Sequence, residues 1–356
     1  MNMKKLISTL IVLNIVALAF SQRVDLDKFN FTATYRNFPT DPLKEEYKTY
    51  NVRIEAAPSV QGGLNMAYLQ DNISIEGLKK VPGTGHITII AIMDDIIVEK
   101  TETKERLDVK KDKSGNEIKK TMYAVEMTYS FSARATVYDY KGNTILDNYT
   151  LYSRDNKSTY KTSESESSTD AMNQYNNKLM DTRSGLAKKL VSSAISNLNS
   201  IMNNSYGYTV QRANDILWIL NNKRHLEYDG HQKAWNSFRN AVVLMSADEP
   251  LDKVKEKMQP AIDYFEKIKT KYTTSSKDDR KLRYASYYNL AKIYLYLDDP
   301  QSALREADAL AMNDFDASDA KGLRAMAESL EALFKENQTR SRHFAMDVKT
   351  YEPPVK

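Results

Sequence analysis

The feature that most constrains the fold is an alternation of apolar and polar residues between Tyr123 and Val137. Every second position in this segment is apolar, and the positions between them, from Glu126 to Thr136, are polar or charged. Successive side chains of a β-strand point to opposite faces, so a period of two predicts one long strand with a single buried face.

The flanking segments predict further strands. The apolar segment 86–107 joins the long strand through a turn at 112–116, and a second turn at 139–143 leads to a third strand at 144–152. Asp94 and Asp95 are expected inside the first of these strands, where their carboxylates would face opposite sides. With short candidate strands at 49–56 and 72–78, the pattern predicts a mostly antiparallel sheet of about four to six strands.

A helix from about Asn173 to Met202 is predicted to cover one face of this sheet, because a sheet with one apolar face must bury it. Its apolar stripe consists of Leu186, Leu190, Ala194, Leu198 and Ile201. The segment 157–170, rich in Ser, Thr and Glu, lacks apolar periodicity and is interpreted as a surface loop, with a modification or docking site as the alternative.

Strand patterns end near Tyr208, and segments of helical period follow to the C-terminal region. Helices are expected at 209–224, 231–245, 251–272, 281–297, 300–313 and 318–337. The sequence therefore predicts an α+β protein with a signal peptide (1–21), a sheet domain (22–205), an all-α helical domain (206–337) and an extended tail (338–356).

One helix pair, from Tyr287 to Leu310, resembles a tetratricopeptide repeat. Tyr287, Leu290, Ala291 and Tyr294 match the signature of its first helix, and Ala303 matches the small position of its second. The resemblance implies antiparallel helix pairs that stack into a partner-binding array. The chain departs from the family pattern at Ala291 and Asp298, where glycines are usual, and at Ala307 and Phe315.

Local chemistry agrees with a helix pair at this point, because Asp299 can cap the second helix while Pro300 occupies its first turn. A looser unit lies upstream, where Ala261 and Phe265 match the small and large positions of a second helix. These positions predict about two repeats and a capping helix. That is fewer than the three or so that form an independent solenoid, so the helices near Trp218 and Trp235 must complete the stack.

The N-terminal residues indicate export. Lys4 and Lys5 precede an apolar run from Leu6 to Phe20, and small residues precede Gln22, as in a signal peptide cleaved between Ser21 and Gln22. The apolar run is shorter than the roughly 20 residues that a membrane-spanning helix needs. A membrane anchor is the alternative.

The whole chain also resembles exported proteins of Bacteroidota that have no assigned activity. The stretches that carry this resemblance are FPTDPLKEEYKTYNV, GYTVQRANDILWILNNKRHLEYDGHQKAW and the helix pair itself. It implies a periplasmic or otherwise exported protein and no particular chemistry.

Composition excludes several functions. The chain has no cysteine, which rules out disulfides, thiol nucleophiles and a lipoprotein anchor. The chain has 51 Lys and Arg residues, and two of them, Lys4 and Lys5, belong to the predicted signal peptide. The remaining 49 exceed the 47 acidic residues by only 2, so nucleic acid is not an expected partner. The sequence contains no HExxH, G-x-S-x-G or P-loop motif, and no cofactor is expected.

Two groups of residues are candidate sites. The first has imidazole and carboxylate groups within a short segment, which could bind zinc or a similar ion, or could simply cap helices: His225, Glu227, Asp229 and His231. The second is a set of tyrosines on one helix that are candidates for contacting a partner: Tyr284, Tyr288 and Tyr296. Five tyrosines on that helix cannot share one stripe, so we expect at least one, Tyr296, to reach the surface.

These observations predict a non-catalytic envelope protein that acts as a scaffold or accessory subunit through its helical domain, with other envelope proteins as partners. The alternative is an enzyme or a carbohydrate-binding protein whose site lies between the two domains.

Overall fold

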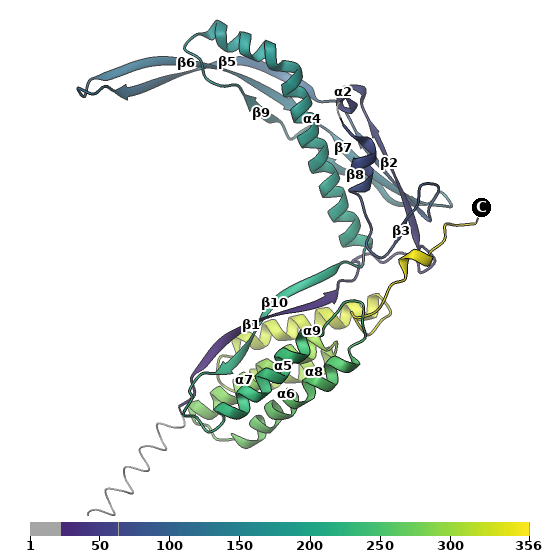
Figure 1. Cartoon of the computed structure of the whole chain (residues 1–356), viewed down its shortest axis with the longest axis vertical. Coiled ribbons are helices and arrows are strands. Elements are labelled where there is room, and N and C mark those ends of the chain that lie inside the picture. Colours follow the sequence, from purple (N-terminus) through teal and green to yellow (C-terminus); the bar gives the residue numbers. More distant parts are fainter. Residues whose placement is uncertain (1–22, 63, 356) are drawn as a thin grey trace, which may run out of the picture. The chain divides into compact units, whose positions relative to one another are not determined.

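The computed structural model describes residues 23–62 and 64–355, which divide into two compact units (Figure 1). The helical unit contains residues 23–38 and 208–346, and the sheet unit contains residues 39–207 and 347–355. Antiparallel sheets precede a run of helices, so the predicted α+β class is confirmed. The predicted cleavage site lies outside the described residues.

Two sheets and one long helix build the sheet unit. The first sheet has the strand order β3-β2-β4-β7-β8, with β2 parallel to β3 and β4 and antiparallel pairs elsewhere. The second is antiparallel throughout, in the order β5-β6-β9. The strands are β2 (Thr49–Ala56), β3 (Lys79–Lys80), β4 (Ile87–Met93), β5 (Ile97–Lys111), β6 (Glu117–Ser130), β7 (Ala133–Asp139), β8 (Thr144–Tyr152) and β9 (Ser158–Lys161).

The long strand predicted from Tyr123 to Val137 is two strands in two sheets. β6 ends at Ser130, and β7 begins at Ala133. β6 pairs with β5 and β7 pairs with β4, and the chain is likewise interrupted between β4 and β5. At this interruption the amide of Asp94 donates to the carbonyl of Ser132 at 3.0 Å. The alternation of buried residues continues through the break, so the period of two could not reveal it.

This break corrects the prediction for the two adjacent aspartates, because Asp94 and Asp95 lie between strands rather than inside one. The Asp94 carboxylate pairs with Arg134 at 3.1 Å, and Asp95 accepts a hydrogen bond from Ser59. The prediction of a strand at 72–78 is also wrong. These residues form no strand, and the short strand β3 begins directly after them at Lys79.

The predicted covering helix is present as α4 (Ser168–Tyr206), which packs against β5 and β6 of one sheet and β8 of the other. Ser167 begins it by accepting a hydrogen bond from the amide of Asp170. Its most buried residues include Ala187, Val191, Ala194, Leu198 and Met202. Two short helices, α2 (Pro58–Gln61) and α3 (Met66–Asp71), complete this unit.

In the helical unit, each helix packs against the next along the chain. The helices are α5 (Tyr228–Val242), α6 (Asp252–Lys271), α7 (Lys277–Tyr296), α8 (Pro300–Ala311) and α9 (Ser318–Glu336). Asp299 caps α8 by accepting a hydrogen bond from the amide of Ser302 at 3.0 Å, and Pro300 occupies its first turn, as predicted. Among the residues that the structure describes, no helix combines the length and apolar character needed to cross a bilayer.

The predicted all-α composition of this domain is wrong. Residues 209–224, predicted as a helix, contain the strand β10 (Val210–Leu220), which pairs antiparallel with β1 (Leu26–Arg36) over its whole length. β1 comes from the segment predicted to belong to the sheet domain, and the structure places it in the helical unit. A run such as Ile216–Leu220 fits a buried helix or a buried strand equally well, and its pairing partner is distant in sequence.

The region predicted as an extended tail is divided between the units. Residues 338–346 belong to the helical unit, and residues 347–355, with the 3₁₀-helix η1 (Val348–Thr350), belong to the sheet unit. Within the sheet unit, Lys79 Nζ donates to the carbonyls of Lys349 and Tyr351 at 2.9 Å each.

The helices of the α6–α8 region approach one another through alanines, because Ala261, Ala291 and Ala303 are completely buried. We therefore expect Ala303→Leu to overpack its site and lower the free energy of unfolding by about 1–3 kcal/mol. The matched control is Ala311→Leu at the exposed end of the same helix, with an expected change within about 0.5 kcal/mol. Denaturant unfolding of both variants tests this, and equal effects would contradict close packing at Ala303.

Candidate functional site

The three tyrosines predicted as partner contacts face the chain's own strand β10. Tyr284, Tyr288 and Tyr296 are 2%, 7% and 6% exposed, so the expectation that Tyr296 reaches the surface is wrong. The rings of Tyr284 and Tyr288 lie 6.0 and 6.2 Å from that of Trp218 on β10. These tyrosines therefore recognise an extended segment within the same molecule.

Asn289, which is fully buried on α7, holds the main chain of β10. Its side-chain carbonyl accepts from the amide of Trp218, and its side-chain amide donates to the carbonyl of Trp218, both at 2.8 Å. A third group, His231 Nε2 on α5, lies 3.0 Å from the same carbonyl. Contacts to both backbone polar groups of one residue fix the position of a strand without reading its side chains.

A buried ion pair fixes the same strand one turn of α7 further on. Lys292 Nζ and the hydroxyl of Tyr296 both bond Asp215 Oδ2 at 2.8 Å. The side chains of Lys292 and Asp215 are only 9% and 14% exposed. Burial, reinforced by the charge of Asp215, raises the pKa of Tyr296 above its ordinary value, so the phenol stays protonated and donates.

The four metal-ligand candidates do not converge. Asp229 is exposed, whereas His225 accepts a hydrogen bond from the amide of Glu227 at 3.0 Å and His231 faces Trp218. Within residues 23–62 and 64–355, no group of three or more His, Asp or Glu side chains has the arrangement of a metal site. Glu227 occupies the N-cap position of α5, but its side chain makes no capping hydrogen bond.

Glu227 is instead part of a contact between the start of α5 and the end of α6. Its carboxylate accepts from Lys271 and, at 2.9 Å, from the hydroxyl of Tyr272. Burial disfavours its charge, but these hydrogen bonds outweigh burial and hold the pKa of Glu227 below its ordinary value. The charged carboxylate therefore ties two helices together.

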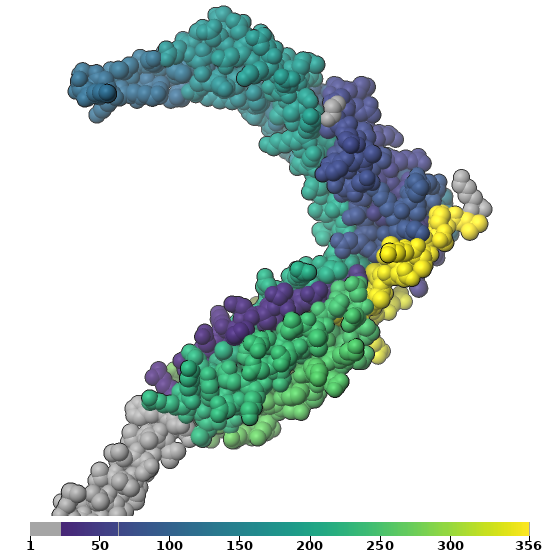
Figure 2. Space-filling view, viewed as in Figure 1, coloured from purple at the N-terminus to yellow at the C-terminus, as the bar shows by residue number. Residues whose placement is uncertain are grey.

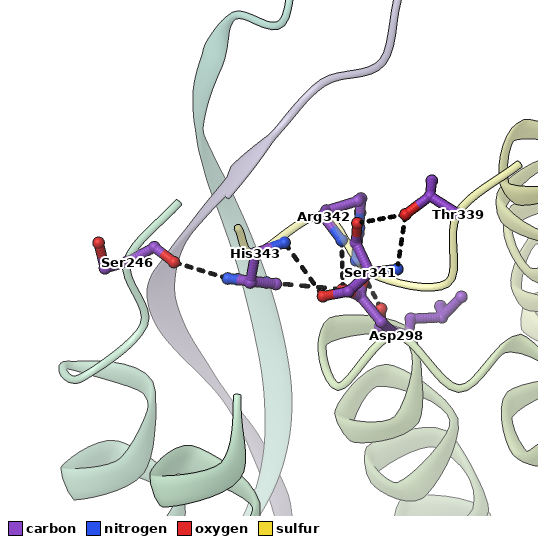
Figure 3. A network of polar contacts seen from close by, with 7 residues as sticks. Ser246, Asp298, Thr339, Ser341, Arg342 and His343 are labelled. Carbon is purple, nitrogen blue, oxygen red and sulfur yellow. Dashed lines mark hydrogen bonds and ion pairs between the residues drawn. The ribbon is translucent and has the colours of Figure 1, made fainter. Parts of the chain in front are cut away.

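A second polar network fixes residues 339–343 to the turn between α7 and α8 (Figure 3). Asp298 accepts from the amide and the Nε of Arg342 at 2.6 and 2.7 Å, and from the hydroxyl of Ser341 at 3.0 Å. Asp298 has a φ of 59°, at the position where the resembling repeat has a glycine. Asp298 thus adopts a backbone conformation that is unfavourable for a residue other than glycine, and its buried carboxylate binds Ser341 and Arg342.

His343 completes this network on its other side. Its Nδ1 lies 2.7 Å from the carbonyl of Ser246 and, because a carbonyl only accepts, Nδ1 carries the proton. Its Nε2 lies 3.9 Å from Asp298 Oδ2. Burial lowers the pKa of His343, so the ring is held neutral between two loops of the helical unit.

In the sheet unit, a small polar pocket lies between the β9 region and α4. Its lining consists of Tyr160, Thr162, Ser163, Gln174, Tyr175, Lys178 and Thr182. Its lining contains neither a carboxylate nor an imidazole.

The sequence analysis did not identify the residues that fix β10 within the helical unit. Asn289 and Asp215 belong to no motif, and β1 was not predicted. The alternation of Phe29, Phe31, Ala33 and Tyr35 is the signal that could have found that strand. No known protein-family model matches this chain, and no curated protein matches it.

The buried His231 gives a testable pH dependence. Burial lowers its folded-state pKa from 6.5 to about 4. As pH falls below 6.5 the unfolded chain binds a proton that the folded chain refuses, so His231 removes stability progressively between pH 6.5 and 4, up to roughly 3 kcal/mol.

His231→Gln keeps an N–H for the Trp218 carbonyl but does not titrate. We expect the free energy of unfolding of this variant to depend less on pH between 6.5 and 4 than that of the wild type. Denaturant unfolding at pH 7.5 and 4.5 measures the difference. Parallel pH profiles for the two proteins would contradict a neutral His231.

Proposed function

We propose that this protein is an exported, non-catalytic scaffold or accessory subunit of the cell envelope, and that its helical unit is a polypeptide-binding module of the tetratricopeptide type. The observation that carries this proposal is the set of hydrogen bonds and ring contacts between α7 and β10. Asn289 bonds both the backbone amide and the backbone carbonyl of Trp218, and the rings of Tyr284 and Tyr288 lie beside the Trp218 ring.

The use of its polar residues supports a non-catalytic role. Glu227, Asp215 and Asp298, the buried carboxylates of the helical unit described above, each neutralise a cation that holds two segments together. Groups committed to such pairs stabilise one geometry and are poor acid–base catalysts, because their protonation would leave the partner charge unpaired.

An exposed apolar pair offers a surface for a partner. Val243 and Leu244, which directly follow α5, are 74% and 50% exposed. Adjacent exposed apolar residues on a soluble unit suit a protein contact, which would remove them from water.

Cross-linking in the native envelope tests the proposed role. We expect the tagged full chain to retain at least one protein reproducibly, and the double variant Val243→Asp, Leu244→Asp to lose most of it. Met312→Asp, at another position that is 80% exposed, is the matched control and should retain the partner. Absence of any reproducible partner, or substrate turnover by the purified protein, would overturn the proposal.

Export is tested separately. Because the N-terminal residues match a cleavable signal, the mature protein should begin near Gln22 and fractionate as a soluble or peripherally held protein. N-terminal sequencing decides this, and an intact Met1 in the membrane fraction would contradict it.

A further inference from the structure

The two edges of the β1–β10 ribbon differ. At Trp218, both backbone polar groups of β10 point away from β1, because Asn289 on α7 bonds them. Lys28 is paired opposite Trp218, so its backbone groups point outward from the other edge. The backbone groups of Asn30, Thr32 and Thr34 also point outward, because every second residue of a strand faces the same edge. One edge of the ribbon is thus covered by α7, and the other is formed by β1.

The end of the β1 edge already accepts another segment of chain. The amide of Arg36, which has the same parity, donates to the carbonyl of Arg342 at 2.9 Å. Within the described part of the chain, β1 has no strand partner except β10. In Figure 2 the purple atoms of β1 lie on the surface of the helical unit beside the green helices. The outward amide of Lys28 donates to Asp27 Oδ1 at 2.8 Å, so the open sheet edge runs from Asn30 to Thr34.

The long edge strand β5 carries many more charges than β1. β5 has the sequence IVEKTETKERLDVKK, and its closely spaced charges discourage pairing with another chain. In β1, LDKFNFTATYR, the outward positions are Lys28, Asn30, Thr32 and Thr34, without a carboxylate or a proline. Lys28 is the one charged residue among these four positions, and the segment from Asn30 to Thr34 is uncharged and contains two threonines, which favours strand addition there.

The side chains beneath this edge are also incompletely covered. Phe29 and Tyr35 point to the same side as the buried Phe31 and remain half-buried. A strand added to β1 would cover them further and would extend the sheet across the helices.

We propose that β1 pairs antiparallel with β1 of a second copy of this chain, which makes the protein a two-fold dimer with a continuous four-stranded sheet. Pairing centred on Phe31 places Asn30 opposite Thr32 of the second copy and Lys28 opposite Thr34. No like charges are then directly opposed, and the outward backbone groups of Asn30 and Thr32 gain partners in the second copy. This inference goes beyond the proposed scaffold role and requires no envelope partner.

Sedimentation of the mature full-length protein tests the dimer. We expect a dimer mass at micromolar concentration, and a monomer at those concentrations would overturn the proposal. The variant Asn30→Glu, Thr32→Glu places like charges opposite each other twice and should raise the dimer dissociation constant at least about tenfold. The control Met312→Glu, at an 80% exposed position directly after α8, should leave the constant unchanged.

A charge-reversed partner distinguishes this pairing from a general loss of stability. Mixing Asn30→Glu, Thr32→Glu with Asn30→Lys, Thr32→Lys should restore a mixed dimer, because each Glu then faces a Lys. Circular dichroism checks that both variants are folded. A dimer that persists in either variant alone, or a mixture that stays monomeric, would overturn the proposed pairing.

Discussion

The helical unit depends on the antiparallel pairing of β1 with β10 and on the hydrogen bonds that α7 makes to this two-stranded ribbon. Phe31 and Ala33 of β1 and Leu217 of β10 belong to the same buried cluster as residues of α5, α6 and α7. Without the ribbon these helices would expose that surface to water. Because the two strands come from segments on either side of the sheet unit in the sequence, the helical unit is assembled from distant parts of the chain.

Buried charges give this assembly its specificity. The pairs of Lys292 with Asp215 and of Arg342 with Asp298 join segments that are far apart in sequence. Their net contribution to stability is limited by the cost of removing charges from water, but removing one partner leaves the other uncompensated. A wrong docking of the ribbon or of residues 339–343 would therefore be strongly disfavoured.

Three of the polar residues that the sequence suggested as metal ligands have structural partners. His225 accepts from the amide of Glu227, His231 lies beside the carbonyl of Trp218, and Glu227 accepts from Lys271 and Tyr272. What the helical unit offers to other molecules is backbone and surface: an open strand edge along β1 and apolar residues at the end of α5.

The sequence by itself determined the fold class, the covering helix α4, and the caps at Asp299 and Pro300, because periodicity and capping depend on near neighbours. Only the tertiary structure decided that the strand ending at Ser130 and the one starting at Ala133 belong to different sheets, and that residues 210–220 pair with β1. It also decided the roles of Asn289 and of the α7 tyrosines. These features depend on contacts between residues far apart in the chain, and an apolar run carries the same local pattern whichever partner finally buries it.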